Sequence, residues 1–128
     1  METLPTVIRQ FIEHCIPSID VLDILLLVRR EAPKEWGALA LSRALSIERS
    51  SVQSHLQKLQ AASVLSSRRI GNEDVFGYSP ANTDLMDTVT QLDKWYSSYR
   101  LAVVSAIYEN PSNRIQTYPK DIPKERRR

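Results

Sequence analysis

One segment of the chain brings basic and uncharged polar side chains together at helical spacing. Val52, Leu56 and Leu59 recur four and three residues apart and predict one buried helix face. The opposite face then presents Arg49, Ser50, Gln53, Ser54 and Gln57. Because an α-helix fits the major groove of DNA, where arginine, serine and glutamine reach base edges, this face is suited to reading a DNA sequence.

Further basic residues stand where they are suited to phosphate contact. Lys58 lies on the same predicted helix, and Arg68 and Arg69 come just before a turn. Between residues 43 and 69 five basic residues stand against one acid, Glu48, although the whole chain has a net charge of only +2. Positive charge is therefore concentrated in this stretch, as contact with a nucleic-acid backbone requires.

Residues suited to catalysis or metal binding are few. The chain has one cysteine, Cys15, and two histidines, His14 and His55. His14 and Cys15 are adjacent, so on a helix they point about 100° apart and do not form a nucleophile and base pair. One thiol and two distant imidazoles also fall short of a thiolate metal site within one chain. We therefore expect no enzyme activity, no metal and no cofactor.

The polar helix needs a scaffold, and the sequence predicts its elements in order. Ser18 is a typical N-cap before a dense apolar helix, and residues 38–45 favour a second helix that precedes the polar one. Val64 to Ile70 and Val75 to Tyr78 have the composition of two strands, joined by turn residues at 71–74. This order predicts a mainly α fold with a small β-hairpin.

The segment from Leu41 to Leu59 resembles the helix-turn-helix of the MarR and ArsR type transcriptional regulators. Ala61 to Leu65 is similar to the family's exit into the wing, and the resemblance covers about residues 18 to 80. It implies a winged helix-turn-helix, with Trp36 to Ala38 as a short first strand. Where the family usually has glycine in the turn between the two helices, this chain has Ser46, at a site that favours a left-handed backbone.

The resemblance implies a sequence-specific DNA-binding transcriptional regulator. Its recognition helix would span about residues 48–61 and its wing hairpin about 64–78, with double-stranded DNA as the partner. Because a fold does not fix a function, the alternative is a winged-helix module that binds another protein and never contacts DNA.

A second helical pattern lies beyond the predicted wing. Apolar residues at spacings of three and four predict one long helix over about residues 83–109. So long an apolar stripe would be exposed in a monomer, so we expect a second copy of the chain to cover it. The residues expected at this homodimer interface are Leu92, Trp95, Tyr96, Tyr99, Val103 and Ile107. The alternative is that the helix folds back over its own chain.

The length of 128 residues suits one domain with short additions. We expect an N-terminal extension with a short helix over 1–17, a winged domain over 18–80, a long helix over 81–110 and a flexible basic tail over 111–128. A single cysteine and apolar stretches far below the roughly 20 residues of a membrane span predict a cytoplasmic protein that does not enter membranes. A small-molecule effector between the long helix and the winged domain is a further alternative.

Overall fold

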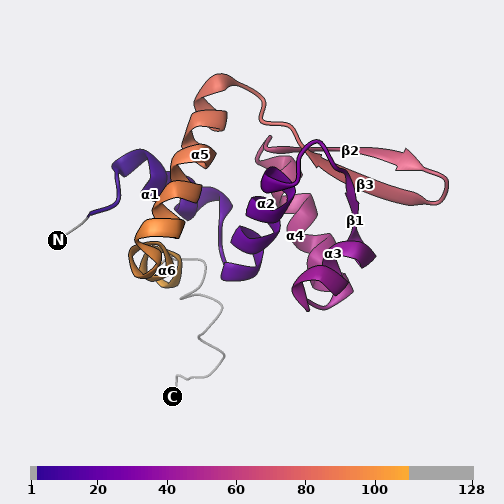
Figure 1. The fold of residues 1–128 in the computed structure, drawn as a ribbon, viewed down its shortest axis with the longest axis horizontal. Helices are drawn as coiled ribbons and strands as arrows, with labels where there is room; N and C mark the ends of the chain where they lie inside the picture. Colours follow the sequence, from indigo (N-terminus) through magenta and orange to yellow (C-terminus); the bar gives the residue numbers. More distant parts are fainter. Residues whose placement is uncertain (1–2, 110–128) are drawn as a thin grey trace, which may run out of the picture.

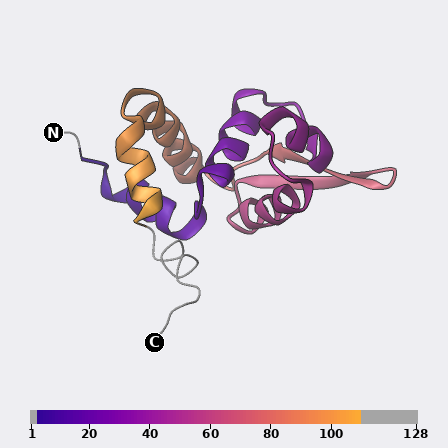
Figure 2. The same cartoon turned by 90° about the horizontal axis from the view of Figure 1, so that it is seen from below.

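A computed structural model describes residues 3–109, and within them six helices and three strands form two lobes (Figures 1 and 2). The elements are α1 (Thr6–Cys15), α2 (Ile19–Arg30), β1 (Trp36–Gly37), α3 (Ala38–Leu45), α4 (Arg49–Ala61), β2 (Leu65–Ile70), β3 (Glu73–Tyr78), α5 (Thr83–Ser98) and α6 (Arg100–Tyr108). We call α1, α5 and α6 the terminal lobe and the remaining elements the sheet lobe. In this range no helix has the length and apolar character needed to cross a bilayer.

Helix α2 forms the centre of the sheet lobe, where it packs against α3, α4 and β3. The Ser18 side chain caps it by accepting a hydrogen bond from the backbone N–H of Val21 at 3.3 Å, which confirms the predicted N-cap. Six of its apolar side chains are buried, among them Leu22 and Leu25. The buried side chains of α2 therefore belong to the core that the neighbouring elements cover.

Helices α3 and α4 are joined by a tight turn at Ser46. This residue has φ 58° and ψ 44°, the left-handed conformation that the family resemblance implied for the position. The Ile47 backbone N–H donates to the Ser42 carbonyl at 3.2 Å and closes the turn. A residue with a Cβ is disfavoured there by about 1 kcal/mol, which the turn tolerates.

The sheet has the strand order β1-β3-β2 and is antiparallel throughout. Ile70 pairs with Glu73, so the hairpin turn consists of Gly71 and Asn72 alone, and Gly71 takes a φ of 61° that suits glycine. The predicted turn over residues 71–74 was therefore too long. Glu73 and Asp74 belong to β3 and lie opposite the last residues of β2.

The C-terminal part of the described chain is not one long helix, which corrects the prediction for residues 83–109. Helix α5 ends at Ser98 and α6 begins at Arg100, because Tyr99 has φ −135° and ψ 60°, outside the helical range. The two helices run in different directions (Figure 1), and both pack against α1. The basic tail predicted for residues 111–128 lies outside the described residues.

The break in the helix changes the role of the predicted dimer residues. Because α5 and α6 fold onto α1, four of these side chains are buried in the core of the chain itself: Leu92, Tyr96, Val103 and Ile107. They are therefore not available to a second copy, and the predicted seam is corrected at these positions. Trp95 is half-buried and Tyr99 is 43% exposed, and their rings lie 5.0 Å apart.

Candidate nucleic-acid interface

Helix α4 separates its apolar and polar residues as the sequence predicted. Val52, Leu56 and Leu59 are fully buried. The side chains exposed on the other face are Arg49, Ser50, Gln53, Ser54, Gln57 and Lys58. The first turn contains no acid of the helix itself, although the exposed Glu48 is its N-cap residue.

The exposed face of α4 divides into two flanks. Arg49, Gln53 and Gln57 line a cleft of about 580 Å³ between α4, α3 and the β2–β3 hairpin. Lys58 lies on the other flank, where it borders a separate hollow against the end of α1 that includes His14. The polar residues predicted to act together are thus split, and the cleft holds the long side chains best suited to base edges.

The two hairpin arginines also point to different places. Arg69 lines the cleft, and its Nη1 atom lies 3.2 Å from the Asp74 Oδ1 atom. Arg68 is absent from the cleft lining and donates three hydrogen bonds of 2.7–2.9 Å to the Glu35 carboxylate. These bonds hold the pKa of Glu35 below its ordinary value and raise the pKa of Arg68. The structure therefore brings only one of the two predicted arginines to the cleft.

The cleft also contains acids that sequence reasoning missed. Glu73 and Asp74 line it together with Arg49 and Arg69, so two carboxylates balance two guanidinium groups. The charge surplus counted over residues 43–69 ends just before these acids. A two-residue turn at Gly71 and Asn72 was the sequence signal that could have located these acids. Such a turn places Glu73 and Asp74 in β3, directly opposite the last residues of β2.

Three solved structures share this arrangement of elements. One is reduced HlyU from Vibrio cholerae, with TM-score 0.51 and 16% identity over 66% of this chain and 81% of that chain. Another is Mb0332 from Mycobacterium bovis, described as a homodimeric winged helix-turn-helix DNA-binding domain of a possible ArsR-family regulator, with TM-score 0.55 and 16% identity over 77% and 93%. The third is BpsR from Bordetella bronchiseptica, whose DNA binding is regulated by 6-hydroxynicotinic acid, with TM-score 0.53 and 13% identity over 85% and 78%.

The fold is a winged helix-turn-helix. Helices α3 and α4 form the helix-turn-helix, α4 is in the position of the recognition helix, and the β2–β3 hairpin is the wing. No protein-family model matches the sequence, and comparison with curated proteins gives no significant match. At 13–16% identity, the three likenesses support the predicted fold.

Three further titratable side chains, His14, Cys15 and His55, lie on α4 or beside it. The His55 ring is half-buried, and burial, with a smaller effect of Lys58, lowers its pKa, whereas Asp20 raises it. The Nδ1 atom of His14 lies 2.8 Å from the Gln10 carbonyl at the end of α1. Burial raises the pKa of the Cys15 thiol, which disfavours the reactive thiolate. Residues 3–109 contain no group of three or more candidate metal ligands.

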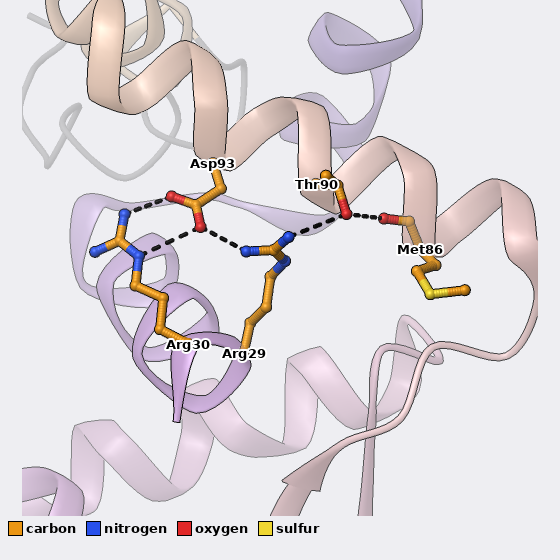
Figure 3. A network of polar contacts seen from close by, with 5 residues as sticks. All are labelled: Arg29, Arg30, Met86, Thr90 and Asp93. Carbon is orange, nitrogen blue, oxygen red and sulfur yellow. Dashed lines mark hydrogen bonds and ion pairs between the residues drawn. The ribbon is translucent and has the colours of Figure 1, made fainter. Parts of the chain in front are cut away.

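A cluster of ionic contacts joins the two lobes (Figure 3). The Asp93 carboxylate of α5 lies between the guanidinium groups of Arg29 and Arg30 from the end of α2, with 2.7 Å between Arg29 Nη1 and Asp93 Oδ2. Arg29 also donates to the Thr90 hydroxyl at 3.1 Å, and that hydroxyl donates to the Met86 carbonyl at 2.8 Å. We call Arg29, Arg30, Thr90 and Asp93 the interlobe clamp.

Proposed function

We propose that this chain is a sequence-specific DNA-binding transcriptional regulator that acts as a homodimer. The observation that carries the proposal is the cleft in which Arg49, Gln53 and Gln57 of the recognition helix face Arg69 of the wing. A helix in the major groove and a wing beside it would use this cleft together. Mb0332 and BpsR, which share the fold, are described as DNA-binding, and this supports the proposal.

Each exposed residue has a role that follows from its chemistry. Gln53 and Gln57 can pair with adenine, and Arg49 with guanine, through bidentate hydrogen bonds. Ser50 and Ser54, also exposed, are short enough to contact a base edge or a phosphate close to the helix.

The phosphate contacts would lie on both sides of the groove. Lys58 is exposed on the outer flank of α4, where the DNA backbone would pass. Arg69 can exchange its exposed carboxylate partner for phosphate, whereas Arg68 is held by three hydrogen bonds to Glu35. We therefore assign the wing contact to Arg69.

The second copy of the chain would bind a surface that shares only Tyr99 with the one that the sequence predicted. Helix α6 exposes Leu101 by 81% and Tyr108 by 66%, and their seven-residue separation places them on one helix face. Solvent exposure of two such large side chains is unfavourable, and Mb0332, with the same fold, is described as homodimeric. We propose that this face of α6, with Tyr99 beside it, forms the dimer contact and sets two recognition helices about 34 Å apart.

Genome-wide recovery of bound DNA tests the proposed function directly. The wild-type chain is expected to recover a near-palindromic motif. Gln53→Ala should relax the preference at one base pair per half-site by about 1–3 kcal/mol with little loss of thermal stability. Gln91→Ala, at an exposed position on α5, is the matched control. A wild-type chain that binds no DNA at low salt would refute the proposal and favour the protein-binding alternative.

Analytical ultracentrifugation tests the dimer surface. The double variant Leu101→Glu and Tyr108→Glu should sediment as a monomer, because it places charge on the proposed contact. Met86→Glu alters an exposed apolar residue on α5 and should leave the mass unchanged. If the double variant has the mass of a wild-type dimer, the α6 face is not the interface.

A further inference from the structure

The acid nearest to the wing arginine is built into the hairpin register. Arg69 and Asp74 are cross-strand partners, and both side chains are more than half exposed, at 64% and 56%. The Nη2 atom of Arg69 also donates to the Asn72 carbonyl at 3.4 Å. The cationic group that would contact phosphate is therefore occupied, in the free chain, by acceptors of the wing itself.

The second acid of the cleft lies at the start of the helix-turn-helix. Gly37 precedes α3, and a Cβ atom built there would lie 1.8 Å from the Glu73 Oε2 atom, so the Glu73 carboxylate rests against this glycine. No side chain of Gly37 can cap the helix, and the first-turn N–H groups of α3 favour a negative charge nearby. Glu73 thus brings negative charge to another place at which a DNA phosphate would be attracted.

We propose that Glu73 and Asp74 are specificity-determining residues that compete with DNA phosphate inside the cleft. This inference rests on the proposed function. Nonspecific binding depends almost wholly on attraction between basic side chains and phosphates, and a cleft with two acids and two bases attracts the backbone weakly. Contacts of Gln53 and Gln57 with base edges do not require that attraction. The two acids therefore weaken binding to random DNA more than binding to the correct site.

The exchange of partners at Arg69 gives this competition a mechanism. On random DNA, a phosphate must displace the Asp74 carboxylate from Arg69. The new ion pair then adds little binding free energy, because it replaces an ion pair of similar strength. At the correct site, contacts from the recognition helix hold the backbone beside the wing, so that a phosphate replaces Asp74 at a high local concentration. Arg69 then adds to affinity chiefly where the bases match.

The other ion pair of the wing provides a matched control. Arg68 and Glu35 have the same chemistry, but Arg68 and Glu35 are both absent from the cleft lining. The Glu35 side chain passes over Gly77 of β3, whose missing Cβ would lie 3.3 Å from the Glu35 Cγ atom. Removal of the Glu35 charge changes the net charge of the chain as much as removal of the Asp74 charge, and it leaves the cleft unaltered.

The test compares Asp74→Asn, Glu73→Gln and Glu35→Gln in the full chain, with fluorescence anisotropy on a mixed-sequence duplex and on the recovered site. Between roughly 50 and 200 mM salt, Asp74→Asn should bind the mixed duplex about threefold to tenfold more tightly, and the salt slope should steepen by about one phosphate contact. Glu73→Gln should act in the same direction. Affinity for the recovered site should rise less, so the specificity ratio falls.

The outcomes separate this inference from the proposed function. Adding Arg69→Ala to Asp74→Asn should remove the gain, and Glu35→Gln should produce none. If wild type binds a specific site but Asp74→Asn and Glu73→Gln leave the specificity ratio unchanged, the inference fails and the proposed function stands. If Glu35→Gln gives the same gain, net charge is the cause and the inference fails as well. If neither wild type nor any variant binds DNA, both fail. Melting temperatures verify that each isosteric variant is folded.

Discussion

The interlobe clamp and the wing both pair arginines with carboxylates, but in different surroundings. Side-chain exposure in the clamp is 12% for Asp93, 24% for Arg29 and 49% for Arg30. In the wing it is 64% for both Arg68 and Arg69, and 56% for Asp74. The same chemistry thus occurs with a buried carboxylate where α5 meets the end of α2, and with exposed arginines in the wing.

The difference in burial determines what each group of arginines can do. A largely buried carboxylate has lost most of its water and depends on its partners, and its removal leaves Arg29 and Arg30 without the anion they share. An exposed pair contributes little to stability and exchanges its partner readily. The clamp therefore holds the two lobes together, whereas the wing arginine that faces the cleft remains available to another anion.

The largest expected effect is the loss of the clamp. Asp93→Ala should lower the free energy of unfolding by about 2–3 kcal/mol, because two guanidinium groups would then face each other without their carboxylate. Urea denaturation measures this. Asp87→Ala, at an exposed position of the same helix, should change it by less than about 0.5 kcal/mol. Equal losses in the two variants would show that burial does not distinguish the clamp from a surface acid.

Substitution of the wing arginines is expected to have a smaller effect. It should change DNA binding and leave stability nearly unaltered. Arg69→Ala should weaken binding to the recovered DNA site about tenfold, since one phosphate contact is lost beside the recognition helix. Arg68→Ala should weaken it less than about twofold, because its side chain is directed to Glu35 and away from the cleft. Both variants should melt close to the wild-type temperature. A larger binding loss in Arg68→Ala would reverse the assignment of the wing contact.

The smallest effect concerns His55. Its ring is half-buried, so its exposure lies between that of the clamp carboxylate and that of the wing arginines. Burial keeps its pKa in the folded chain below the ordinary 6.5, so the unfolded chain binds a proton first as pH falls. Its contribution to stability is therefore full above pH 6.5 and declines as pH falls through that value towards the lower folded pKa. His55→Gln should flatten urea midpoints measured between about pH 5 and 8. Parallel pH profiles for the two chains would contradict this.

Local features of the fold were predictable because their causes are local. The Ser18 cap and the apolar face of α4 each depend on a few neighbouring residues, whereas the left-handed backbone at Ser46 was expected from the family resemblance. The break at Tyr99 had no such signal, since no glycine or proline marks it and the apolar spacing continues through it. Packing of α5 and α6 on α1 determines their directions, and that contact joins the two ends of the described chain.

The ion pairs of the clamp and of the cleft were missed because they, too, depend on how separate segments pack. Arg29 and Asp93 are 64 residues apart in the sequence. The position of Arg29 at the end of its helix therefore does not reveal that Asp93 is its partner. Sequence analysis did identify the polar cleft residues of α4 and Arg69, but it divided the hairpin wrongly and counted Glu73 and Asp74 as turn residues. A count of charges along the chain cannot show which of them face each other.

The position of α1 beneath the last two helices has a consequence for biosynthesis. Ile8 and Ile12 are fully buried, and the helices that cover them are α5 and α6. On the ribosome α1 emerges long before those helices are translated, while the elements of the sheet lobe lie close together in sequence and can assemble as they appear. The nascent chain thus carries α1 as an uncovered apolar helix until α5 and α6 have emerged, and a chaperone that shields this segment would act during that interval.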